Sequence, residues 1–251
     1  WYFWAIACVG LLLGNVVIVR SAAEETADWM YGLLLVVTVV GVLVFLPYFR
    51  GYAVFGRADV LSHVGYIRDI QETGAIGQRN IYPNFHLLVL SLAYVVGVDP
   101  STMIMGIAGI GSLFSIVSFL ALVSTVFDRR RALLSLPFAT VLVAVQSVPY
   151  VFSTFLVPFV LYVFVLERRT HAYHLRVALV LCVLALVIYH PITSLFVLLI
   201  FGVYEVARLL HRREFLGTDV CGETDPVGTI PLSQLVVSVF MLWYLAFDKI
   251  V

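Results

Sequence analysis

Long apolar runs separated by short polar turns limit this chain to few folds. Eight runs approach the roughly 20 residues that a helix needs to cross a bilayer. They span residues 2–19, 30–48, 102–126, 132–148, 150–166, 176–190, 192–210 and 231–248. Charged residues make up only 12% of the chain, whereas a soluble domain carries about 25%. The pattern therefore predicts an all-α fold, a polytopic bundle of transmembrane helices.

The apolar runs leave no room for a soluble domain, so we expect residues 1–251 to form a single transmembrane module. Pro149 and Pro191 each divide a pair of runs, which predicts two tight helical hairpins with their tips at one membrane face. The chain begins at Trp1 inside one apolar run and stops at Val251 just after another. We therefore expect the native protein to extend beyond both ends.

The positions of the arginines predict which side of the membrane each loop faces. Three clusters stand out: Arg129, Arg130 and Arg131; Arg168, Arg169 and Arg176; and Arg208, Arg212 and Arg213. Cytoplasmic loops carry an excess of basic residues, so these three regions are predicted to be cytoplasmic. The long loop over residues 49–101 is then extracytoplasmic, and we expect the protein in the plasma membrane with its active face outside.

Residues 56–97 form the only long segment that is both polar and patterned. The pattern predicts a helix over residues 59–73, with Asp59 as its N-cap and Gly74 ending it. Helical spacing places His63 on the same face as Asp59. The adjacent face is apolar and carries Val60, Val64 and Ile67. A helix of this kind is predicted to lie on the membrane surface.

Tyr82 and Pro83 predict the start of a second helix, which ends near Gly97. About 14 residues at 1.5 Å each reach about 21 Å, which is short of the roughly 30 Å hydrocarbon core. We therefore expect this helix to lie in the interface, so that two polar helix starts meet near one membrane face.

Few ionisable residues are predicted on the external face. Asp59 leads them because His63 follows it by one helical turn and Arg57 precedes it by two residues. A helix cap and a surface histidine explain the same two residues without any chemistry, and His190 before Pro191 is equally well explained as an ordinary helix end. Asp59, His63, His86 and His190 also offer carboxylate and imidazole ligands, so a divalent metal remains an open alternative and no cofactor is certain. Nucleic acid is not an expected partner.

The order of these residues resembles the first external loop of the GT-C glycosyltransferases. The resemblance rests on GRAD at positions 56–59, then His63, a helix closed by Gly74, and Tyr82-Pro83 before an apolar helix. These polytopic enzymes use sugars carried on polyprenyl phosphate, and the resemblance implies that Asp59 is the catalytic base. Position 60 is valine, where many members carry a second acid.

On this interpretation Asp59 and His63 are the catalytic residues, and a cation from Arg57 or Arg79 faces the phosphate of the donor. Tyr82, His86 and His190 complete the predicted substrate-binding set. The expected partners are a lipid-linked sugar donor, membrane lipids and a hydroxyl or amide acceptor of unknown identity. Two other functions stay open: a transporter with an external Asp/His relay, and a membrane assembly subunit without activity. An external pocket lined by Asp59, His63 and His190 would favour the enzyme.

Overall fold

The computed structural model describes residues 1–52, 58–141 and 148–215, and these ranges contain only helices and the turns between them. The helices are α1 (Tyr2–Glu24), α2 (Trp29–Phe49), α3 (Ala58–Thr73), α4 (Pro83–Val96), α5 (Pro100–Val126), α6 (Arg129–Val141), α7 (Pro149–Thr170), α8 (Tyr173–Tyr189) and α9 (Pro191–Phe215). The predicted all-α class is confirmed.

Among the described residues, four helices, α1, α2, α5 and α7, are long and apolar enough to cross a membrane, which indicates a multi-pass membrane protein. They coincide with the predicted crossings at 2–19, 30–48, 102–126 and 150–166. The predicted crossings at 176–190 and 192–210 correspond to shorter apolar helices, α8 and the first part of α9. The run at 132–148 is described as α6 only as far as Val141. The run at 231–248 lies outside the described residues.

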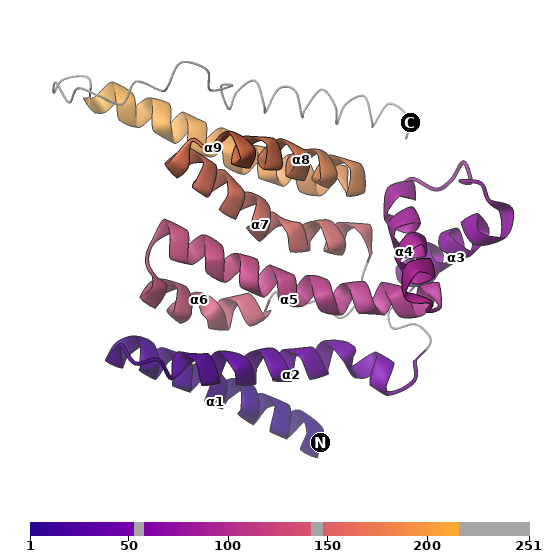
Figure 1. The fold of residues 1–251 in the computed structure, drawn as a ribbon, viewed down its shortest axis with the longest axis horizontal. Coiled ribbons are helices and arrows are strands. Elements are labelled where there is room, and N and C mark those ends of the chain that lie inside the picture. Colours follow the sequence, from indigo (N-terminus) through magenta and orange to yellow (C-terminus); the bar gives the residue numbers. More distant parts are fainter. Residues whose placement is uncertain (53–57, 142–147, 216–251) are drawn as a thin grey trace.

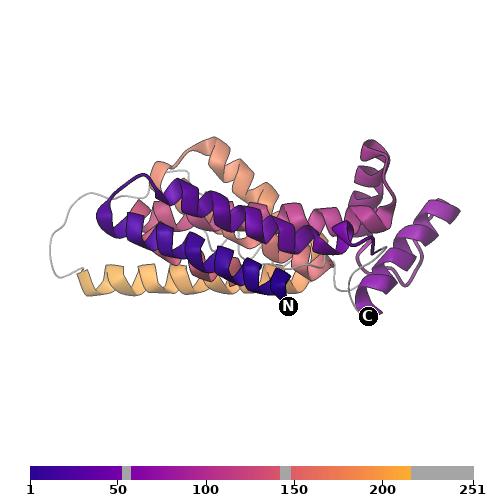
Figure 2. The same cartoon turned by 90° about the horizontal axis from the view of Figure 1, so that it is seen from below.

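The long helices lie side by side, and α3 and α4 lie beyond one end of them (Figure 1). A view turned by a right angle shows the same arrangement, with α4 running across the direction of the bundle in both views (Figure 2). Helices α7 and α9 both start at a proline at this same end (Figure 1). Helices α8 and α9 pack together, so the predicted hairpin at Pro191 is confirmed. The turn that leads to Pro149 falls in residues 142–147, outside the described residues, so the predicted hairpin there is not tested. The polar segment of the sequence therefore forms a separate layer at one end of the apolar helices.

Three buried apolar clusters hold the helices together in the part of the chain that the structure describes. One joins α1, α2, α5 and α6, and a second joins α7, α8 and α9. The third fixes the end layer, because α3 contributes Val60 and Ile67, α4 contributes Phe85, and α5 and α7 contribute Ile104 and Phe155. The apolar face predicted for α3, which carries Val60, Val64 and Ile67, is therefore the face that packs on the bundle.

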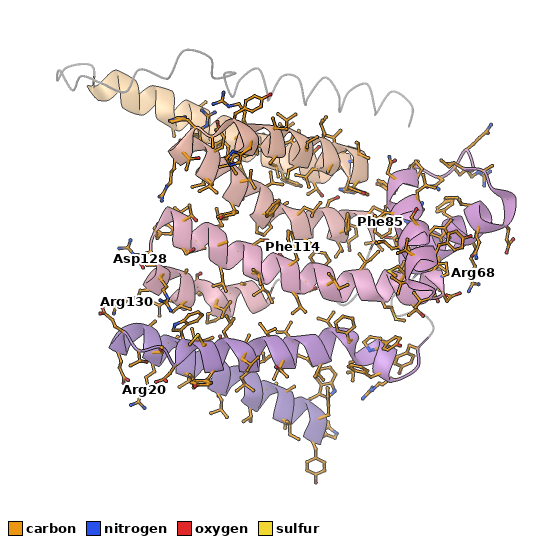
Figure 3. All side chains as sticks on the ribbon, in the orientation of Figure 1. Arg20, Arg68, Phe85, Phe114, Asp128 and Arg130 are labelled. Atoms are coloured by element: carbon orange, nitrogen blue, oxygen red, sulfur yellow. The ribbon has the colours of Figure 1, made fainter. Side chains whose placement is uncertain are left out.

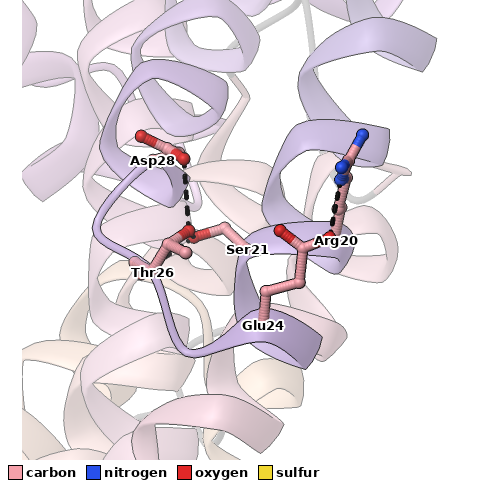
Figure 4. A network of polar contacts seen from close by, with 5 residues as sticks. All are labelled: Arg20, Ser21, Glu24, Thr26 and Asp28. Atoms are coloured by element: carbon pink, nitrogen blue, oxygen red, sulfur yellow. Dashed lines mark hydrogen bonds and ion pairs between the residues drawn. The ribbon is translucent and has the colours of Figure 1, made fainter.

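The opposite end of the bundle carries most of the charge in the described part of the chain. Arg20, Asp128 and Arg130 lie there, whereas Arg68 and Phe85 lie at the end of α3 and α4 (Figure 3). The turn from α1 to α2 is held by Ser21, whose hydroxyl accepts a hydrogen bond from the Trp29 amide at 2.9 Å. The Ser21 and Thr26 hydroxyls are 2.8 Å apart, and the Thr26 hydroxyl donates to Asp28 (Figure 4).

A buried ion pair at this charged end ties α7 to α8. Nε of Arg176 donates to Oε1 of Glu167 at 3.0 Å, and the Glu167 side chain is only 6% exposed. Nε of Arg168 lies 3.7 Å from the second Glu167 oxygen. The two arginines of this predicted cytoplasmic cluster therefore share one carboxylate, which neutralises part of the cluster.

Candidate functional site

Helix α3 carries Asp59 and His63 at the end of the bundle. It begins at Ala58, so Asp59 lies in its first turn and the predicted role of Asp59 as the N-cap is wrong. A carboxylate in the first turn still interacts favourably with the positive end of the helix dipole. Gly74 ends the helix with a φ of 67°, the left-handed conformation that favours glycine. The local sequence thus fixes where α3 ends better than where it starts.

Helix α4 starts in a turn built by Asn80. Oδ1 of Asn80 accepts a hydrogen bond from the Tyr82 amide two residues ahead at 3.2 Å, which is a typical asparagine turn. Pro83 then occupies the first helical position, where its missing N–H has no cost. Asn80 is buried. The sequence pattern did not predict Asn80 as a site residue, and its position two residues before Tyr82-Pro83 was the only available signal.

His63, His86 and Asn80 form a hydrogen-bonded chain, which we call the histidine relay. Nδ1 of His63 lies 2.8 Å from Nε2 of His86, and Nδ1 of His86 lies 2.7 Å from Oδ1 of Asn80. His63 is 5% exposed and His86 is fully buried. The interpretation of His63 as a surface residue is therefore wrong, because the helix turns this face toward α4.

Burial sets the protonation of the relay. Burial, and to a smaller extent the charge of a protonated His63, together lower the pKa of His86 from 6.5 to about 3. Burial also lowers the pKa of His63, and the nearby carboxylate of Asp59 opposes this shift without cancelling it. Both imidazoles are consequently neutral at neutral pH.

Asp59 connects the relay to solvent. Its Oδ1 lies 3.6 Å from Nε2 of His63, and its side chain is 70% exposed. A protonated His63 would therefore form an ion pair with Asp59, whereas a neutral His63 presents its second nitrogen to an aqueous carboxylate. The predicted Asp59–His63 pair exists, with a buried member and an exposed member.

The α8–α9 hairpin brings His190 to the same end through Tyr82. The Tyr82 ring stacks on the His190 ring with centroids 5.5 Å apart, and it lies 6.1 Å from the His63 ring. Nδ1 of His190 is 2.9 Å from the hydroxyl of Thr193. Burial raises the pKa of Tyr82, and the charge of Asp59 raises it further. Tyr82 therefore stays a neutral phenol between His63 and His190.

The two arginines predicted to bind the donor phosphate do not belong to the buried relay. Arg79 is exposed in the turn before α4, and Arg57 lies outside the described residues. Within the described ranges, no three His, Cys, Asp or Glu side chains are arranged to hold a metal ion. His63 and His86 turn the nitrogens that would face a shared metal toward each other instead.

An apolar cavity lies next to this end layer. Its volume is about 660 Å³, and its walls come from α2, α4, α5 and α7. Helix α4 forms part of both features, because Leu88, Leu92 and Val96 line the cavity while His86 joins the relay. The other walls are almost wholly apolar and include Phe45, Met103, Phe114, Phe152 and Phe155. The cavity has the dimensions and chemistry of a site for a hydrocarbon chain.

Comparison with known proteins finds no matching family model, no match among curated proteins and no match among solved structures.

Proposed function

We propose that the protein is a membrane glycosyltransferase that moves a sugar from a polyprenyl-phosphate carrier to an acceptor hydroxyl or amide. One observation carries the proposal: an Asp–His pair backed by buried polar groups lies at the end of a membrane bundle, beside an apolar cavity. Helix α4 contributes His86 to the buried polar groups and also forms part of the cavity wall. The resemblance of positions 56–97 to the GT-C enzymes points to the same chemistry.

The proposed reaction needs three kinds of group. A base must take the proton of the acceptor, a cation must face the leaving phosphate, and an apolar surface must hold the prenyl chain. The Asp59–His63 pair supplies the base. Arg79 is the described cation nearest in sequence to the relay, and Arg57 precedes Asp59 by two residues. The cavity beside α4 supplies the apolar surface.

The proposed active face is extracytoplasmic, because the arginine clusters at the opposite end of the bundle follow the positive-inside rule. Gly77 lies in the turn between α3 and α4, and His171 lies between α7 and α8. We expect a cysteine at position 77 to react with an impermeant thiol reagent added to intact cells, and a cysteine at position 171 to be protected. The reverse labelling pattern would place the site on the cytoplasmic side.

The activity test uses the full-length protein in proteoliposomes with a polyprenyl-phosphate sugar. Asp59→Asn keeps the shape of the side chain and removes its charge, so transfer should fall about 10²-fold or more. Asp69→Asn is the matched control, because Asp69 is an exposed acid on the same helix. Full activity in Asp59→Asn with unchanged folding would remove Asp59 from the reaction. Absence of transfer by the native protein with any lipid-linked sugar would favour the assembly subunit.

The transporter alternative receives less support from the relay. A proton path needs a group that both gains and loses a proton at each step, and the relay ends at the amide of Asn80, which does neither. The hydrogen bonds of the relay are suited to orienting the His63 ring and not to conducting protons through the bundle.

A further inference from the structure

The orientation of the Asn80 amide fixes the proton of His86. The Tyr82 backbone N–H is a donor only, so the Asn80 atom that receives it must be the carbonyl oxygen Oδ1. The same oxygen lies 2.7 Å from Nδ1 of His86. A hydrogen bond between these atoms requires the proton on Nδ1, because the oxygen has none to give. Neutral His86 therefore carries its lone pair on Nε2.

The same logic extends to His63. Nε2 of His86 accepts, so Nδ1 of His63, 2.8 Å away, must donate. Neutral His63 then has its lone pair on Nε2, the nitrogen that faces the exposed carboxylate of Asp59 at 3.6 Å. One backbone amide in the turn before α4 thus determines which nitrogen of His63 is free to take a proton.

We propose that Nε2 of His63 is the base that takes the proton from the hydroxyl of the sugar acceptor. His86 and Asn80 are positioning residues that keep the proton of neutral His63 on Nδ1. The inference rests on the proposed glycosyl transfer and deepens it. Asp59 stabilises the imidazolium that forms, since its carboxylate faces the newly protonated nitrogen. Protonation leaves the rest of the relay unchanged, because Nδ1 of His63 donates to His86 in both states.

The step balances as follows. The acceptor O–H bond breaks and its proton moves to Nε2 of His63, while the oxygen forms a bond to the anomeric carbon of the sugar. The bond from that carbon to the phosphate oxygen breaks, and the polyprenyl phosphate leaves with the electron pair. The proton passes from His63 to solvent or to the phosphate, and the enzyme returns to its first state.

The surroundings of His63 agree with this assignment. The rings of Tyr82, Phe85 and His86 surround it, and Asp59 is the charged group that faces it from its own helix. Nδ2 of Asn80 is buried without a hydrogen-bond partner in the described part of the chain. A buried amide nitrogen without a hydrogen-bond partner destabilises the folded state. Its retention fits a role for the other Asn80 atom, the oxygen that orients His86.

The first test reads the tautomers directly by nitrogen NMR of the full-length protein with ring-labelled histidine in lipid nanodiscs, with His63→Gln and His86→Gln assigning the signals. In the native protein we expect His63 and His86 both to carry the proton on Nδ1. Asn80→Leu should release His86 and move the His63 proton to Nε2, whereas Asn80→Asp keeps an accepting oxygen and should retain the native tautomers. Asn84→Leu is the matched control, because Asn84 is exposed four residues further along. A proton on Nε2 of His63 in the native protein would overturn the inference, whatever the variants do.

The second test follows transfer in proteoliposomes. Asn80→Leu should lower kcat about 10²-fold with little change in KM, and Asn80→Asp should restore it to within about threefold of the native value. Equal losses in both variants would refute the positioning role. Native tautomers as inferred, without transfer from any lipid-linked sugar, would reject the proposed function and with it the proton transfer, but leave the relay intact. Glycosyl transfer by a native protein whose His63 carries its proton on Nε2 would reject the inferred relay but leave the proposed function intact.

Discussion

Acidification should loosen the end layer of α3 and α4, because the relay holds a histidine that takes up a proton far less readily in the folded than in the unfolded chain. His86 is fully buried, and its pKa in the folded protein is about 3 against an ordinary value of 6.5. Between these two values the unfolded chain binds a proton that the folded chain does not. Stability therefore rises with pH across this window and falls as the pH drops below 6.5.

The magnitude follows from the distance between the pH and the ordinary pKa. About pH 5 is about 1.5 units below the pKa of a histidine in the unfolded chain. Each unit changes the free energy of unfolding by about 1.36 kcal/mol. The opening of the end layer should become easier by about 2 kcal/mol between about pH 7 and pH 5, or about thirtyfold in an equilibrium constant. His63 adds to the effect in the same direction, since its pKa is also lowered by burial.

Backbone hydrogen exchange in nanodiscs measures this opening. Protection factors, which correct for the intrinsic effect of pH on exchange, should fall about thirtyfold for α4 amides. Amides in the middle of α2 serve as the internal reference, because that helix lies outside the end layer. His86→Gln removes the titrating group and should remove most of the pH dependence. Unchanged α4 protection in the native protein, or the same fall in His86→Gln, would refute the reasoning.

Five substitutions test the packing and the buried ion pair. Phe85→Ala empties a fully buried site in the cluster that joins α3, α4, α5 and α7 and should cost about 3–5 kcal/mol. Leu87→Ala, at an exposed site on the same helix, should cost less than about 1 kcal/mol; equal shifts in thermal unfolding would contradict the burial argument. Glu167→Ala leaves two arginines without their shared carboxylate and should cost about 2–3 kcal/mol in the same assay, and an unchanged melting temperature would show that the pair adds nothing. Gly32→Ala places a Cβ 2.6 Å from a backbone oxygen of α1 and should destabilise the α1–α2 hairpin, whereas Gly41→Ala, with open space around it, should stabilise α2 slightly; the opposite order would refute the close approach.

The sequence by itself determined the features that are local along the chain. Apolar runs of membrane length predicted α1, α2, α5 and α7, since a helix must satisfy its own backbone within the bilayer. The period of Val60, Val64 and Ile67 predicted which face of α3 is buried, because helical geometry alone places these residues on one side. Gly74 predicted the end of α3 for the same local reason. The start of that helix was predicted one residue late, since Asp59 suits both a cap and a first turn.

Only the tertiary structure decided which polar residues meet. His63 and His86 are 23 positions apart on different helices, so their contact depends on how α3 packs against α4 and not on any local period. The burial of Asn80, the approach of His190 to Tyr82 and the cavity beside α4 depend on the same packing. A side chain's spacing along its own helix gives the face on which it lies, whereas its protonation and hydrogen bonds are set by the neighbouring helix that covers this face.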